Sequence, residues 1–467
     1  MSLLIRGGAV DGQTVDLRID DGVVDAMEPQ LAPCSEDEVL EAGGAEVIPG
    51  LHDHHVHLRS LAASATSVSV GPPDIRTADD LRQRLVQAAG RSTGSWIRAT
   101  GYHESVAGPL DRYRLDELVP GGTLLRVQHR SGGLWILNSV ALSAIQLDGV
   151  DLPGIERDAD GRPTGRLWRL DRWLATRVPS VDADVASMVA RSFRFGVTGW
   201  TDADPTDDAG AATALASTLA GQPVTPRLCL MAPPGARSPG EGALLGPVKV
   251  MLDDDQLPSL EGLTQRVTTA HRGRRPVAVH CVTTVQLWLT LLALADAGAL
   301  PGDRIEHGAE IPPEAFAPLR ATGVVVVTQP NLVAERGDRY REEVPAEDLP
   351  NLWRLRSLLD AGVPVAAGTD APFGDPDPWA AMRAAVSRTT LDGFVLSPEE
   401  RVTPVTARAL FFGGPETPHR PRVIRRGSVA DLCVVEAASR PGEPVLDADG
   451  VRATVLDGDV VYRRTPS

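Results

Sequence analysis

The stretch Glu46-Val-Ile-Pro-Gly-Leu-His-Asp-His-His-Val-His-Leu58 holds four of the chain's ten histidines within six residues, directly after an apolar run. In a β-strand, side chains two residues apart share a face, so His55 and His57 can bind one ion while Val56 packs on the opposite side. His52 and His54 have the opposite phase and are not counted as ligands. The pattern predicts a metal-binding strand, with a histidine-rich surface loop as the alternative.

Four more ionisable residues lie in or at the ends of apolar runs, namely Lys249, His280, His307 and Asp370. Such runs occur eight times, with helical stretches between them, at 46–51, 196–202, 227–231, 248–252, 277–281, 304–307, 324–328 and 363–370. This βα rhythm predicts an α/β fold of the (β/α)8 TIM barrel type. Because the C-terminal ends of barrel strands meet at one mouth, all six residues are expected to converge there. Taken singly, each has a structural alternative, such as a helix cap for Asp370.

The two ends of the chain follow a different pattern. Short alternating runs with glycine turns occur at 3–6 and 15–27, and again at 430–435 and 451–462. Neither end has enough strands to close a core, so we expect 1–45 and 420–467 to pair as one small β-sandwich domain beside a barrel at 46–419. The interval from about 60 to 185 breaks the βα rhythm and is predicted to be an insertion after the first barrel strand.

Composition excludes several classes of partner. The 467 residues include 46 basic and 62 acidic ones, which gives a net charge of −16, and nucleic-acid binding needs a basic face. No window approaches the roughly 18 apolar residues of a membrane span. The four cysteines lie far apart without CxxC spacing, which favours a reducing, cytoplasmic location. A small-molecule substrate is the expected partner.

These motifs resemble the amidohydrolase superfamily, and within it the YtcJ-like branch that includes N-substituted formamide deformylases. The motifs that match are Pro49-Gly-Leu-His-Asp-His-His-Val-His57, Gly196-Val-Thr-Gly-Trp-Thr-Asp202, Lys249, His280, Glu306-His307-Gly308, Gly368-Thr369-Asp370 and the terminal β segments. The resemblance covers nearly the whole chain and implies a (β/α)8 barrel with a side β-sandwich. It also implies a set of metal ligands, which is His55, His57, His280, His307 and Asp370.

The resemblance further implies a role for Lys249. Where such proteins hold a metal pair, the lysine at this place is usually carboxylated, and a carbamate can bridge ions about 3.5–4 Å apart. A plain ammonium paired with Asp253 or Asp254 is the alternative. Imidazoles with a carboxylate suit Zn, Mn, Fe or Ni, and Zn is the default for hydrolysis. We therefore expect one or two divalent ions. Barrels of this family often dimerise, so a homodimer is one possible assembly, but no exposed feature of the sequence demands it.

The predicted reaction is hydrolysis of a C–N amide-like bond, of the N-acyl or formamide type, by metal-activated water. Asp370 would take a proton from the water and pass it to the leaving amine. Ring deaminases of the superfamily carry a glutamate three residues after the fifth-strand histidine, where this chain has Thr283, so ring deamination is disfavoured. An esterase or lactonase using the same site, and a non-catalytic barrel that only binds a ligand, are the alternatives.

Candidate substrate contacts lie in the insertion. Its polar clusters Gly101-Tyr-His-Glu-Ser105 and Arg126-Val-Gln-His-Arg-Ser-Gly132 adjoin apolar runs, and in related proteins such clusters help to form the upper wall of the pocket. The candidates are Tyr102, His103, His129 and Arg130, each of which could equally be a hydrogen bonder within the insertion.

Overall fold

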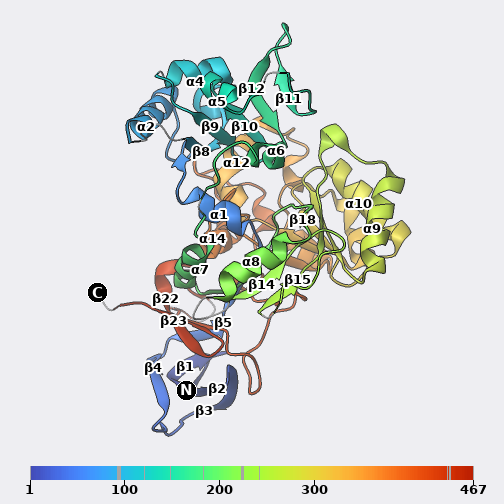
Figure 1. Cartoon of the computed structure of the whole chain (residues 1–467). Helices are drawn as coiled ribbons and strands as arrows, with labels where there is room; N and C mark the ends of the chain where they lie inside the picture. The colour runs from blue at the N-terminus through green and yellow to red at the C-terminus, as the bar shows by residue number, and fades with distance from the viewer. Residues whose placement is uncertain are drawn as a thin grey trace. The chain divides into compact units, whose positions relative to one another are not determined.

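The computed structural model describes residues 2–91, 96–119, 121–147, 149–181, 183–221, 226–240, 242–438, 440 and 443–465. The chain forms two compact units, drawn in Figure 1. One unit comprises Met1–Leu58 and Val185–Ser467, and the other comprises Arg59–Asp184. Among the described residues, none of the helices combines the length and the apolarity that a membrane crossing requires.

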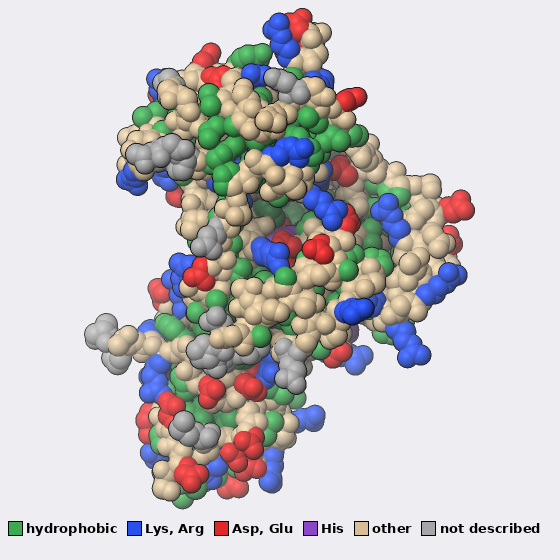
Figure 2. Space-filling model, in the orientation of Figure 1, with side chains coloured by type: hydrophobic (Ala, Val, Ile, Leu, Met, Phe, Trp, Pro, Cys, Tyr) green, Lys and Arg blue, Asp and Glu red, His purple; other side chains and the backbone are tan. Residues whose placement is uncertain are grey.

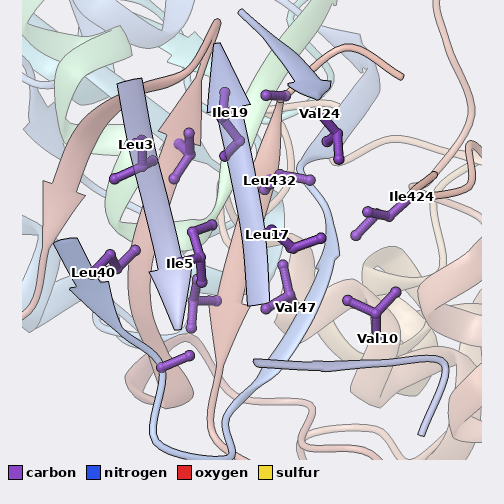
Figure 3. Close-up of a cluster of buried hydrophobic side chains, with 14 of the residues drawn as sticks. Leu3, Ile5, Val10, Leu17, Ile19, Val24, Leu40, Val47, Ile424 and Leu432 are labelled. Atoms are coloured by element: carbon purple, nitrogen blue, oxygen red, sulfur yellow. The ribbon is translucent and has the colours of Figure 1, made fainter. Parts of the chain in front are cut away.

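Strands from both ends of the chain form one eight-stranded sheet, in the order β23-β22-β21-β5-β1-β2-β3, with β4 on β1. The bounds are β1 (Ser2–Val10), β2 (Gln13–Asp20), β3 (Val23–Glu28), β4 (Asp37–Glu41), β5 (Glu46–Pro49), β21 (Leu432–Val435), β22 (Val451–Leu456) and β23 (Asp459–Arg463). Antiparallel pairing of β5 with β21 joins the two ends. Figure 3 shows side chains from both ends, such as Leu17, Val47 and Leu432, meeting in one buried cluster. The apolar positions of each end are therefore buried by the other.

The predicted first barrel strand over 46–51 is wrong in its bounds. Glu46–Pro49 is β5 of the terminal sheet, and a separate strand, β6 (Leu51–Val56), starts after Gly50. Proline has no amide hydrogen to donate to a continuing ladder. A Cβ at Gly50 would lie 2.4 Å from the Thr198 side chain, so only glycine fits where the chain passes from one sheet to the other.

Parallel strands make up the rest of this unit. The first sheet has the order β15-β14-β13-β6, and the second has the order β16-β17-β18-β19-β20. The bounds are β13 (Val197–Asp202), β14 (Arg227–Leu230), β15 (Ala243–Leu245), β16 (Val248–Val250), β17 (Val277–Cys281), β18 (Arg304–His307), β19 (Val325–Thr328) and β20 (Val365–Ala367). The strand β15 was not expected from the sequence.

Helices alternate with these strands as the sequence predicts. The α-helices are α7 (Val185–Ser192), α8 (Ala211–Ala220), α9 (Leu260–Arg272), α10 (Thr284–Ala297), α11 (Phe316–Thr322), α12 (Asn331–Glu343), α13 (Arg356–Asp360), α14 (Pro378–Ser387) and α15 (Pro404–Ala409). The short 3-10 helices are η1 (Phe193–Phe195), η2 (Asp254–Gln256), η3 (Pro313–Ala315), η4 (Leu349–Asn351), η5 (Pro398–Glu400) and η6 (Ala448–Gly450). Figure 1 shows α9 and α10 side by side. The α/β class and the parallel strands are confirmed, and these described strands pair in two ladders.

Hydrogen bonds link the two parallel sheets at both margins. The Asp370 amide, just after β20, donates to the His55 carbonyl of β6 over 2.8 Å, and the His57 amide donates to the Ala371 carbonyl over 2.9 Å. At the other margin, the Ala232 amide donates to the Pro247 carbonyl over 3.3 Å. The strand ends that carry the candidate ligands are thereby held against each other.

The second unit is a mixed six-stranded sheet, in the order β11-β12-β10-β9-β8-β7, with short helices. Its elements are β7 (Val68–Ser69), β8 (Ile97–Tyr102), β9 (Leu125–His129), β10 (Leu134–Leu137), β11 (Ile155–Arg157), β12 (Pro163–Trp168), α2 (Ala78–Arg91), α3 (Glu104–Ala107), α4 (Arg112–Leu118), α5 (Ser139–Ala144) and α6 (Asp171–Ala175). Helix α1 (Leu58–Ser64) begins at the boundary between the units. Alternate strand residues enter two cores, one around Val127 and one around Leu137.

A matched pair of valines tests whether the two chain ends share one core. Val434 of β21 is 1% exposed inside the cluster, whereas Val429 just before the strand is 50% exposed. Val434→Ala removes buried methyl groups and is expected to cost about 1–3 kcal/mol of unfolding free energy, measured by chemical denaturation. Val429→Ala is the control, and equal losses from the two substitutions would contradict the shared core.

Candidate metal centre

Three candidate ligands meet where β6 and β20 end. His55 lies on β6, His57 follows the strand directly, and Asp370 follows β20, and all three side chains are buried. One ligand atom of each residue lies within 4.8 Å of the other two. The Asp370 carboxylate oxygen Oδ1 is 3.2 Å from His57 Nε2 and 3.6 Å from His55 Nε2. Figure 2 shows only a trace of histidine surface on the face it presents, as expected for buried rings.

His280 and His307 extend this cluster along β17 and β18. The ring centroid of His307 lies 4.7 Å from that of His55 and 4.6 Å from that of His280. The pairing of β17 with β18 places His280 opposite Glu306 and Cys281 opposite His307. The four predicted histidines and Asp370 therefore lie in one connected group.

The Nδ1 atoms of three of these histidines are held by acceptors. His55 Nδ1 bonds Glu306, His57 Nδ1 bonds Asp204 over 2.8 Å, and His307 Nδ1 bonds the Gln329 amide oxygen over 2.8 Å. A carboxylate or an amide oxygen can only accept, so each ring carries its proton on Nδ1. The Nε2 lone pairs are left for a cation, which is how metal-binding histidines are usually oriented.

Two buried atoms of the cluster lack a hydrogen-bond partner. Nε2 of His55 and Oδ1 of Asp370 are shielded from solvent, and neither makes a hydrogen bond within the described part of the chain. Leaving a buried polar atom unsatisfied costs about 1–3 kcal/mol, so such atoms usually serve a ligand. Imidazole nitrogens together with a carboxylate oxygen are a donor set that suits zinc and similar divalent ions. The residues present therefore fit a divalent metal.

The electrostatics agree with this assignment of protons for His55 and His307, and differ for His57. Burial lowers the pKa values of His55 and His307, which keeps both rings neutral. Burial also lowers the pKa of His57, but the hydrogen bond with Asp204 and the negative charges of Asp204 and Asp370 outweigh it and raise the value to about 10. Without an ion the His57 ring is therefore protonated on both nitrogens, and Nε2 has to release its proton before it can bind a cation. Burial raises the pKa of Asp370, yet the close contact with His57 and the charges of His307 and His55 hold it below its usual range. The carboxylate is therefore ionised at neutral pH.

Lys249 on β16 is the only lysine in the chain, all other basic side chains apart from the histidines being arginine. Burial lowers its pKa, while the charges of Glu306 and Asp370 oppose the shift. No described carboxylate lies within ion-pair distance of its ammonium group. The alternative pairing with Asp253 or Asp254 is thus not seen, and Asp254 instead accepts hydrogen bonds from Thr283 and Gln286.

Several supporting residues were missed by the sequence analysis. Glu306 is one, and it also accepts from Arg304, whose Nε lies 2.7 Å from Glu306 Oε1. The sequence Arg304-Ile-Glu-His contained a signal, because strand alternation puts Arg304 and Glu306 on one face. Asp204 and Gln329 gave no such signal. His52, set aside by its phase, bonds Thr201 over 2.9 Å.

Thr283 has a structural role at the position that ring deaminases use for a glutamate. Its hydroxyl caps α10 in a capping box with Gln286 and also donates to Asp254 over 3.0 Å. Cys281, next to His280, is buried and its pKa is raised to about 12 by burial, so it is not a thiolate nucleophile.

The candidate substrate contacts belong to the second unit. Tyr102 is 0% exposed, lies in the core around Val127, and donates its hydroxyl to the Gly108 carbonyl. Tyr102 therefore offers no surface to a ligand in this structure. Its ring packs in the hydrophobic core of its own unit, although polar residues flank it in the sequence. His103 caps α3, and the Arg130 amide donates to the Tyr102 carbonyl over 2.8 Å. Contact of His103, His129 or Arg130 with substrate stays a prediction.

His103, Glu104 and His129 also lie within metal-binding distance of one another. Their hydrogen bonds argue against a metal, because Nδ1 of His103 accepts from the Ser105 amide and Nδ1 of His129 accepts from the Ser131 amide, each over 3.1 Å. A neutral ring that accepts at Nδ1 carries its proton on Nε2. His129 then donates from Nε2 to Glu104 over 2.9 Å, which lowers the pKa of Glu104 to about 2.

The sequence matches a known protein family and two relatives over nearly its whole length. The sequence model of the amidohydrolase family matches residues 38–462. N-substituted formamide deformylase from Arthrobacter pascens is 26% identical over 94% of this chain and 92% of its own length. The putative amidohydrolase YtcJ from Bacillus subtilis is 22% identical over 92% of this chain and 91% of its own length.

Solved structures agree at the level of the fold. An uncharacterised metal-dependent hydrolase from Pyrococcus furiosus superposes with a TM-score of 0.72, covering 94% of this chain and 99% of its own, at 17% sequence identity. A similar protein from Pyrococcus horikoshii gives the same TM-score.

Glu306 provides a test of how the candidate ligands are oriented. Glu306→Gln removes the charge that holds His55 Nδ1–H and leaves Arg304 without its counterion, so divalent metal affinity is expected to fall about 10- to 100-fold. Competition with a chromophoric chelator measures the change. The exposed Glu314→Gln is the control, and unchanged affinity in Glu306→Gln would contradict the orienting role.

Proposed function

Because this chain belongs to the amidohydrolase family, we propose that it hydrolyses a C–N amide-like bond, of the N-acyl or formamide type, in a small molecule. The family and its relatives indicate a metal-dependent hydrolase. The proposal adds the type of bond and the residues that act on it. The formamide part rests on the likeness to the Arthrobacter pascens deformylase over nearly the whole length of both proteins.

The observation that supports the proposal most directly is the pair of unsatisfied buried atoms, His55 Nε2 and Asp370 Oδ1. In the proposed site, His55, His57, His280, His307 and Asp370 hold one or two divalent ions, with zinc as the first candidate. A divalent ion bound there lowers the pKa of water to about 7 and polarises a carbonyl. We further propose that the parallel strands close into one (β/α)8 barrel around these residues.

Each residue has a stated task in this proposal. Glu306, Asp204 and Gln329 bond the Nδ1 atoms of their histidines, which would leave Nε2 of each ring to bind the ion. Asp370 accepts a proton from the attacking water on a carboxylate oxygen and delivers it to the departing amine nitrogen. Because Asp370 is ionised at neutral pH, it starts the cycle in the form that can accept.

Asp370→Asn tests the proton transfer. The amide keeps the shape and one oxygen donor but cannot accept the proton, so kcat is expected to fall about 10²- to 10⁴-fold while part of the metal remains bound. Turnover of N-substituted formamides and N-acyl amino acids by metal-reconstituted protein measures the rate, and elemental analysis measures the metal. Exposed Asp375→Asn is the control.

The outcomes separate the possible functions. A fully active Asp370→Asn variant would remove Asp370 from the proton path. Wild-type protein that holds metal and hydrolyses only esters or lactones would replace the C–N bond by a C–O bond. Protein that binds no metal after reconstitution would support a binding protein.

Lys249 is proposed to carry a carbamate when two ions are bound. A neutral amine attacks CO₂ and releases one proton, so a lysine whose pKa is lowered by burial and that lacks an ion pair is suited to the reaction. Intact mass at neutral pH is expected to exceed the mass after acid treatment by about 44 Da. Because Lys249 is the sole lysine, the Lys249→Met variant should lose the whole increment. An increment that persists in this variant would contradict the assignment.

A further inference from the structure

The buried arginines of this chain differ in whether a hydrogen-bond acceptor lies beside them. Five arginines in the described residues are less than a tenth exposed. Four of them bond acceptors: Arg304 bonds Glu306, Arg354 bonds Glu400, Arg388 bonds the carbonyls of Leu352, Trp353 and Leu396, and Arg408 bonds Glu46. The fifth is Arg126 of β9, in the unit Arg59–Asp184.

Arg126 has no acceptor within the described chain. It is 7% exposed, and its Nε is shielded from solvent without a hydrogen-bond partner. Its guanidinium group makes a cation–π contact with Trp135, whose ring centroid lies 5.3 Å from the guanidinium carbon. A buried cation without a counterion is costly, so its retention calls for an explanation.

A second arginine stands beside it. Arg98 of β8 is the register partner of Arg126, and its guanidinium carbon also lies 5.3 Å from the Trp135 centroid. Arg98 donates to the neutral acceptors Ser67 and Gln128. No described carboxylate lies within ion-pair distance of Arg98. The two guanidinium groups therefore share one aromatic ring on one face of the sheet.

The acidic group that acts on Arg98, Asp171, already accepts a hydrogen bond from another residue. Asp171 raises the pKa of Arg98 electrostatically, but its carboxylate accepts the indole N–H of Trp135 over 2.7 Å. Burial lowers the pKa of Arg126, and burial together with the charge of Arg126 lowers the pKa of Arg98 to about 10. Both groups stay protonated at neutral pH, so two positive charges lie side by side, and no described carboxylate bonds either of them.

We propose that Arg98 and Arg126 form a binding site for an oxyanion, the carboxylate or phosphate group of a small molecule. Paired guanidinium groups present planar sets of N–H donors that match two oxygens of such a group. Trp135 holds both planes in place through cation–π contacts, and Asp171 fixes the indole. An anion between the arginines would offset their repulsion and satisfy the donors of Arg126. The site uses residues of the second unit alone and does not depend on the metal centre.

Calorimetric titration of the full-length, metal-reconstituted protein with inorganic phosphate, and separately with acetate, tests this site. Saturable binding of at least one probe is expected, and tighter binding of phosphate or of acetate identifies the anionic group. Arg126→Gln should weaken it about tenfold or more, because charge-assisted hydrogen bonds are lost. Arg98→Gln should have a similar effect, and it keeps the test open if Arg126→Gln fails to fold.

Arg177→Gln is the matched control, because Arg177 is an exposed arginine of the same unit that lies 4.1 Å over the Trp173 ring. It removes the same charge and should leave the affinity within about twofold. Three results would overturn the proposal. The first is no saturable binding to the wild-type protein, which would leave a purely structural arginine–tryptophan stack. The others are unchanged binding in both Arg98→Gln and Arg126→Gln, or binding that is lost on removal of the metal and not in these two variants.

Discussion

The contact between β6 and the segment after β20 decides where the candidate ligands lie. Asp53 accepts hydrogen bonds from the amide and the hydroxyl of Thr369, a residue 316 positions later, and from the amide of His55. Burial raises the pKa of Asp53 to about 6, against the effect of these bonds. A Cβ on Gly368 would lie 2.4 Å from the His55 nitrogen, so the two segments approach closely only because that residue is glycine. The positions of His55, His57 and Asp370 all depend on this contact.

Two candidate ligands have unfavourable backbone conformations. His307 and Asp370 have φ values of 71° and 58°, in the left-handed region that costs most residues about 1–3 kcal/mol. Both lie where the chain turns away from the end of a parallel strand. The bond from His307 to Gln329 and the bond from the Asp370 amide to His55 hold them there. The left-handed conformations therefore occur at or just after strand ends, where the chain leaves the sheet and the side chains meet in the ligand cluster.

Part of this arrangement could be read from the sequence. The spacing of His55 and His57 and the strand ends at His280, His307 and Asp370 follow from local alternation and from the rule that parallel strands share one mouth. Partners such as Asp204 and Gln329 depend on how distant segments face each other, which no local period encodes. The break at Gly50 was missed because β5 and β6 follow each other with a single residue between them, and the apolar run Val47–Leu51 spans both. Tyr102 was read as a contact because burial within its own sheet leaves no mark in a sequence.

Charge balance relates the carboxylation of Lys249 to the number of divalent ions bound at the site. Glu306 is committed to Arg304 and His55, and Asp204 to His57, so Asp370 is the acidic partner left near Lys249. An ammonium on Lys249 balances Asp370 formally, and a carbamate turns that sum into two negative charges. Because unbalanced charge is expensive in a buried site, carboxylation requires additional positive charge, which a second divalent ion would supply. The state of Lys249 and the occupancy of the metal centre should therefore change together.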